Sequence, residues 1–134
     1  MRHIARSIIL PSGFAVLGCL TACDDARVPL VQDNAYAQRF IRADPDRGRM
    51  LIAEKGCIAC HSVPQVHSPA SHVGPTLNHI RRQAYLSGVL PNTPANLVRW
   101  LMNPPAINPH TIMPNVGLRQ DEAEDIAAFL VTLP

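Results

Sequence analysis

Cys57-Ile58-Ala59-Cys60-His61 brings two thiols and an imidazole together near the middle of the chain. Two cysteines separated by two residues and followed directly by a histidine form the pattern typical of covalent haem c attachment. The spacing places the thiols over the two vinyl groups of one porphyrin and brings the histidine under its iron. The motif therefore predicts one covalent haem c, attached through Cys57 and Cys60, with His61 as an axial iron ligand.

Three other interpretations of the motif require features that the sequence lacks. A zinc knuckle needs two further Cys or His ligands at short spacing, and the other histidines are scattered. A thioredoxin-like redox pair belongs to a βαβ pattern, which is absent. A disulfide between Cys57 and Cys60 would close a very small loop and would not require His61. Haem attachment accounts for all three side chains.

A second axial ligand must come from elsewhere in the chain, and the candidates are Met50, Met102, Met113, His67, His72, His79 and His110. Met113 lies between Pro109 and Pro114, which prevent a helix and favour an extended loop that can press a thioether onto a haem face. Met50 and Met102 fall within predicted helices, where we expect them to fill the core. His67 and His72 lie in a loop rich in Pro, Ser and His just after the motif, where we expect solvated side chains. We therefore predict Met113 as the second ligand.

The composition fits a single domain with a large cofactor. The chain has 134 residues, of which 47% are hydrophobic, 16% charged and only 4% aromatic, and 13 are prolines. Such a chain needs another source of buried apolar surface, which a porphyrin would supply. The net charge of +2 gives no electrostatic basis for binding nucleic acid.

The N-terminal segment predicts secretion. Arg2 and Arg6 begin a basic region, and the apolar run from Ser7 to Leu20 is shorter than the roughly 20 residues that a membrane span requires. We interpret residues 1–22 as a signal peptide, with an uncleaved anchor helix as the alternative.

The end of that segment predicts a lipid anchor. Leu20-Thr21-Ala22-Cys23 matches a bacterial lipobox, and the similar sequence ending at Cys19 is a weaker match. We expect Cys23 to be acylated and residues 23–43 to tether a domain comprising residues 44–134. The expected location is the periplasmic face of the bacterial inner membrane.

Caps and apolar periodicity predict helices and no strands. Asp44 and Thr93 are suitable N-caps, each followed by a proline at the first helical position. Four acidic residues lie at the start of the last helix, where their negative charges interact favourably with the helix dipole. The predicted helices are 44–55, 78–86, 93–102 and 121–133, with one or two helical turns around 35–41.

Five separated features agree in order with one family. They are Gly48 in the first helix, the Cys57–His61 motif, Gly74-Pro75-Thr76-Leu77, Trp100, and Met113-Pro114 before a terminal amphipathic helix. In these features the chain resembles monohaem, His/Met-ligated class I c-type cytochromes. Residues 88–100 are similar to the cytochrome c domains fused to subunit II of some bacterial cytochrome oxidases, although these 134 residues contain no copper-binding cupredoxin sequence.

The resemblance implies an all-α class I cytochrome c fold, in which the N- and C-terminal helices cross and short helices and loops wrap around haem c. It implies that Phe129 of the last helix crosses near Gly48 and Ile52. It also implies that the carbonyl of Pro75 accepts a hydrogen bond from Nδ1–H of His61, which orients the ring and makes it a better iron donor.

Basic residues dominate the middle of the chain. Between Cys57 and Arg119 there is no acidic residue, and the arginines of this stretch are Arg81, Arg82, Arg99 and Arg119. They form a solvated face, or Arg81 or Arg82 binds the haem propionates together with Tyr85 and the indole N–H of Trp100. The sequence leaves both interpretations open.

The expected function is electron transfer. With both axial positions filled by protein there is no open site for a substrate, and no catalytic constellation appears, so we expect a carrier that is not an enzyme by itself. Expected redox partners are a terminal oxidase, a quinol–cytochrome c reductase or a dehydrogenase, with electrons passing toward an oxidase. The alternatives are a haem c gas sensor, in which Met113 dissociates, and a fixed electron-entry subunit of a dehydrogenase or oxidase complex.

Overall fold

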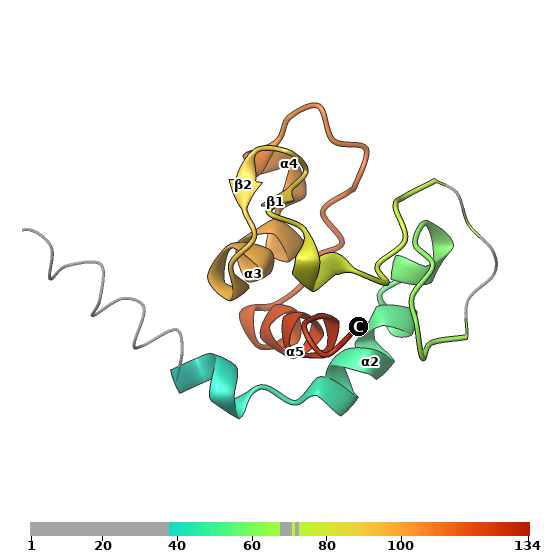
Figure 1. The fold of residues 1–134 in the computed structure, drawn as a ribbon, viewed down its shortest axis with the longest axis vertical. Helices are drawn as coiled ribbons and strands as arrows, with labels where there is room; N and C mark the ends of the chain where they lie inside the picture. The colour runs from blue at the N-terminus through green and yellow to red at the C-terminus, as the bar shows by residue number, and fades with distance from the viewer. Residues whose placement is uncertain (1–37, 68–70, 72) are drawn as a thin grey trace, which may run out of the picture.

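The computed structural model describes residues 38–67, 71 and 73–134, and within them the chain is mostly helical (Figure 1). The elements are α2 (Pro45–Glu54), a 3₁₀ turn (Cys57–Ala59), a second 3₁₀ turn (Ile80–Arg82), β1 (Tyr85–Leu86), β2 (Leu90–Pro91), α3 (Pro94–Met102), α4 (Pro104–Ile107) and α5 (Gln120–Leu130). No helix of the described residues has the length and apolarity needed to cross a membrane. The predicted signal peptide, Cys23 and residues 24–37 of the predicted tether lie outside the described residues.

The first helix begins where its caps predict. The carboxylate of Asp44 accepts hydrogen bonds from the backbone N–H groups of Asp46 (2.9 Å) and Arg47 (3.1 Å), and Pro45 occupies the first helical position. The chain leaves the helix through Gly56, whose φ of 76° lies in the left-handed region. Residues 38–42, just before this helix, form a helical turn that overlaps the turn predicted around 35–41.

Helices α2 and α5 cross at contact distance, at Gly48 (Figure 1). A Cβ atom on Gly48 would lie 2.0 Å from the carbonyl oxygen of Asp125 and 2.9 Å from the backbone nitrogen of Ile126. The expected close approach of the terminal helices is therefore present. Its nearest atoms belong to the backbone one turn before Phe129, whose side chain is buried in the core.

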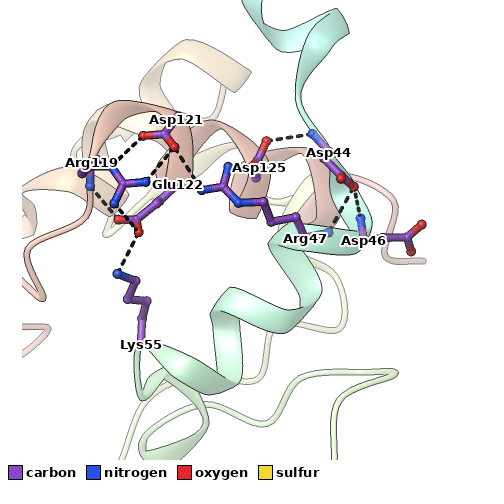
Figure 2. Close-up of polar contacts among 8 residues, drawn as sticks. All are labelled: Asp44, Asp46, Arg47, Lys55, Arg119, Asp121, Glu122 and Asp125. Atoms are coloured by element: carbon purple, nitrogen blue, oxygen red, sulfur yellow. Dashed lines mark hydrogen bonds and ion pairs between the residues drawn. The ribbon is translucent and has the colours of Figure 1, made fainter.

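Ion pairs join the same two helices along their polar side (Figure 2). Arg47 of α2 forms salt bridges with Asp125 and, at 3.0 Å, with Asp121. Lys55 lies 2.9 Å from the carboxylate of Glu122. The side chains of Asp125 and Glu122 are buried, so each needs the cation that faces it across the crossing.

The cations lower the pKa values of two of these carboxylates. Hydrogen bonds from the side chains of Arg119 and Arg47 hold the pKa of Asp121 well below its usual range. The backbone N–H of Arg119, followed by the ammonium of Lys55, lowers the pKa of Glu122. Because the folded-state pKa values are lowered, these contacts stabilise the fold above the ordinary carboxyl pKa. Their contribution is lost as the pH falls through the lowered values.

The helix predicted over 78–86 is wrong beyond its first turn. A 3₁₀ turn ends at Arg82, and Gln83 is extended (φ −71°, ψ 133°). The side-chain amide of Asn92 donates to the carbonyls of Ile80 (2.6 Å) and Gln83 (2.9 Å), which a continuing helix would have used for its own N–H groups.

The expectation of no strands is also wrong in this region. Residues 85–86 and 90–91 form a two-stranded antiparallel hairpin, in which Leu86 pairs with Leu90. Ser87 and Gly88 both have positive φ, 49° and 72°, and the N–H of Val89 closes the turn on the carbonyl of Leu86 at 3.1 Å. Consecutive positive φ values give the backbone twist that tight hairpins need.

Three smaller differences concern the end of α5, the helix α4 and the side chain of Met50. Helix α5 ends at Leu130 rather than at Leu133. Helix α3 ends at Met102, as predicted, but the one-turn helix α4, which was not predicted, follows it. The expectation that Met50 fills the core is wrong, because Met50 is 61% exposed, whereas Gly48, Leu51 and Ile52 are the buried residues of α2.

We predict that Gly48→Ala lowers the free energy of unfolding by about 3 kcal/mol, because the added methyl group meets the backbone of α5. Urea unfolding of the holoprotein, followed by circular dichroism, measures this change. Met50→Ala, in the same helix, should change it by less than about 0.5 kcal/mol. A more stable Gly48→Ala protein would mean that helix propensity outweighs the crossing.

Candidate functional site

A cavity of about 350 Å³ lies between the attachment motif, the hairpin and the loop that carries Met113. Its apolar wall includes Ile52, Leu77, Ile80, Leu86, Leu97, Leu101, Ile126 and Leu130. Among the described residues that line it, none carries a carboxylate, an amine or a guanidinium group. The cavity is therefore shaped for a large apolar group, with polar atoms at a few defined places.

Both cysteines of the motif line this cavity as free, half-buried thiols. The 3₁₀ turn winds the motif tightly, because the carbonyl of Cys57 accepts from the N–H groups of Cys60 (3.2 Å) and His61 (3.0 Å). Burial raises the pKa of the Cys57 thiol, which keeps it protonated at neutral pH. The motif thus presents both sulfur atoms and the imidazole to one space.

The ring of His61 is held on two sides. Its Nδ1 lies 2.7 Å from the carbonyl oxygen of Pro75, the contact that the resemblance implied. Since a carbonyl only accepts, Nδ1 carries the proton and Nε2 is left as an electron-pair donor. A Cβ atom on Gly74 would lie 2.6–3.1 Å from the ring atoms, so only glycine allows the backbone this close.

Met113 lies in an extended segment, half-buried against the core, and lines the same cavity as His61. Its N–H donates to Oγ1 of Thr111 at 3.2 Å. The other candidate ligands lie elsewhere. Met102 packs on the core without lining the cavity, Met50, His67, His79 and His110 are exposed, and His72 is outside the described residues.

Of the four residues considered as ligands of the haem propionates, only one lines the cavity. Trp100 lines the cavity, whereas Arg81, Arg82 and Tyr85 are exposed and are not among its lining residues. Their proposed role remains a prediction. Polar residues that the sequence analysis did not single out, Gln83, Ser87 and Thr111, do line the cavity. No sequence motif identifies these three residues, because the folded hairpin and the segment before Met113 bring them to the cavity.

This donor set fits haem c. Two neighbouring thiols suit thioether bonds to the vinyl groups, the free Nε2 of an oriented imidazole suits the iron, and a thioether lines the same apolar space. Bound there, the haem supplies one-electron redox chemistry, and the chain supplies its attachment, its axial donors and exclusion of water.

We predict that Gly74→Ala disturbs His61, the predicted axial ligand, because the methyl group would meet its ring. A weaker hydrogen bond to Pro75 makes the imidazole a poorer donor to the ferric iron, so the reduction potential should rise by on the order of 40 mV. Potentiometric titration of the holoprotein measures this. Thr76→Ala, one residue beyond Pro75, should leave the potential unchanged, and an unchanged potential in Gly74→Ala would refute the role of this contact.

Comparison with known proteins agrees with this site. The family model described as cytochrome c matches residues 45–134. A relative is cytochrome c oxidase subunit 2 of Alkalihalophilus pseudofirmus, 27% identical over 89 residues, which cover 66% of this chain and 25% of that protein. The chain thus spans about a quarter of the length of this curated relative. It belongs to the cytochrome c family of electron-transfer proteins, which carry covalently bound haem c.

Proposed function

We propose that this protein is a membrane-tethered periplasmic cytochrome that carries single electrons in a respiratory chain, toward a terminal oxidase. The observation that carries the proposal is the shared cavity of Cys57, Cys60, His61 and Met113. We assign the cysteines to thioether bonds and the other two side chains to the axial positions of the iron.

This assignment favours a carrier over an enzyme or a gas sensor. An imidazole and a thioether from the protein fill both axial positions, so no substrate or gas binds without displacing one of them. A thioether is a soft, neutral ligand that stabilises the ferrous state, which places the potential at the higher end for haem proteins. Such a potential suits delivery of electrons to an oxidase.

The rim of the cavity suits outer-sphere transfer. Ile112, Val73 and Val116 line the cavity and are 79%, 61% and 38% exposed. A haem seated against them would have an edge near the surface, where a partner can approach without contacting the iron. Apolar side chains at such a rim also favour short-lived docking that excludes water.

The choice of partner rests on the relative. Cytochrome c oxidase subunit 2 of Alkalihalophilus pseudofirmus is similar to two thirds of this chain. We therefore place this chain next to a terminal oxidase, as a tethered carrier or as a fixed subunit of such a complex. A quinol–cytochrome c reductase or a dehydrogenase would supply the electrons.

Met113→Ala tests the axial assignment. The ferric holoprotein should lose its long-wavelength sulfur–iron band, its ferrous form should bind CO, and its potential should fall. Met102→Ala, a change in a methionine that packs on the core, should keep the band. Rapid binding of CO to the unmodified ferrous protein would instead favour a gas sensor, and retention of the band in Met113→Ala would identify another ligand.

Cys23→Ser tests the tether. We expect the variant holoprotein to move from the membrane fraction to the periplasmic extract, because acylation requires the thiol and stable anchoring requires the acyl chains. Cell fractionation with a high-salt wash, read out by haem staining, measures this. A variant that stays with the washed membranes would indicate an uncleaved anchor helix or a protein partner.

A further inference from the structure

Ser87 stands at an unusual position in the hairpin. It has a φ of 49°, in the left-handed region where glycine, asparagine and aspartate are the usual residues. Ser87 is one of the residues that line the cavity, and its Oγ lies 2.8 Å from Nδ2 of Asn108, in the segment after α4. The hydroxyl therefore joins the hairpin to the segment that leads to Met113.

Asn108 uses its side chain and its backbone to shape that segment. Its N–H closes α4 on the carbonyl of Pro104 (3.0 Å), and its carbonyl accepts from the N–H of Thr111 (3.0 Å). Its Oδ1 accepts from the N–H of His110 at 3.0 Å, which leaves Nδ2 to donate to Ser87. Asn108 thus connects the start of the segment that leads to Met113 with α4 and with the hairpin, and it also closes the first turn of that segment.

These contacts form a continuous chain of hydrogen bonds that ends at Met113. Oγ of Ser87 accepts from the side chain of Asn108, the carbonyl of Asn108 accepts from the N–H of Thr111, and Oγ1 of Thr111 accepts from the N–H of Met113. Between Asn108 and Met113 the described chain has no helix or strand and only a turn at residues 109–110. One backbone hydrogen bond and the side-chain hydrogen bonds of Asn108 and Thr111 therefore hold this backbone.

We propose that Ser87 and Asn108 are positioning residues for Met113, and that their hydrogen bond limits how fast the thioether leaves the iron. The proposal rests on the assignment of Met113 as the axial ligand. Met113 can move away from the iron only if Asn108 separates from Ser87 of the hairpin, or if a hydrogen bond closer to Met113 breaks. Ser87 is 26 positions away from Met113 in the sequence, and it acts through Asn108 and Thr111.

Imidazole binding to the ferric holoprotein tests the proposal. At saturating imidazole the observed rate equals the rate at which Met113 dissociates, and stopped-flow loss of the sulfur–iron band follows it. Ser87→Ala and Thr111→Val should each raise this rate about fivefold, the effect of one ordinary hydrogen bond, and Asn108→Ala should raise it at least as much, because it also removes the bond from the N–H of His110. The Ser87→Ala/Asn108→Ala double variant should be no faster than Asn108→Ala, because both changes remove the same bond.

Asn96→Ala is the matched control. Asn96 also donates a side-chain hydrogen bond to the hairpin, to the carbonyl of Pro91 at 2.9 Å, but it lies on α3 and not in the Met113 loop. In Asn96→Ala, Met113 should dissociate from the iron at the wild-type rate. Hydrogen exchange by mass spectrometry should show faster exchange over residues 109–117 in Ser87→Ala and not in Asn96→Ala.

Three results would overturn the proposal. These are a wild-type rate in Ser87→Ala, an equal acceleration in Asn96→Ala, and multiplicative effects in the double variant. Any of them, found in a protein that shows the sulfur–iron band, leaves the assignment of Met113 intact. A wild-type protein without that band would overturn the assignment itself and, with it, this inference.

Discussion

The contact of α2 with α5 at Gly48 is the constraint on which the site depends. A backbone-to-backbone approach this close fixes both the distance and the angle of the two helices, because no side chain separates them. Ile52 of α2 and Ile126 and Leu130 of α5 then form one wall of the cavity. The attachment motif follows α2 after two residues, so the crossing also determines where the thiols and His61 lie against that wall.

In the described chain the acidic residues lie on the two crossing helices or beside them, and none of them lines the cavity. The acidic residues of the described chain lie between Asp44 and Glu54 or within α5, where arginines and Lys55 face many of them (Figure 2). Residues 57–119, which supply most of the cavity wall, contain no acid. The ion pairs thus clamp the two helices on their polar side, while the cavity side stays uncharged and of low dielectric. A change of iron charge is felt strongly in such an environment.

Local signals predicted much of this from the sequence. Asp44 and Thr93 cap α2 and α3 because capping needs only a side chain and the first turn of the same helix. The hairpin was not predictable, since its strands are two residues long and the bonds from Asn92 that end the preceding turn depend on the folded arrangement. The prediction for Met50 was wrong because an apolar side chain in the sequence does not show which side of α2 will face α5. The contact of Gly74 with the ring of His61 joins two segments of the fold, and in the sequence Gly74 indicates only a turn.

The two side chains that we propose as axial donors, His61 and Met113, are held by different kinds of structure, and this difference has a physical consequence. His61 follows the covalent attachment sites directly, and its ring lies between Gly74 and the carbonyl of Pro75, so its position depends on backbone atoms that side-chain replacement elsewhere leaves in place. Met113 depends on side-chain hydrogen bonds that start at Ser87. Both contacts are exposed, but the partners of His61 are backbone atoms of Gly74 and Pro75, whereas the bond between Ser87 and Asn108 joins two side chains, which open locally and at low cost. Of the two proposed axial donors, one is therefore held by backbone atoms, and the hold on the other can change by single side-chain substitutions without loss of the helical core.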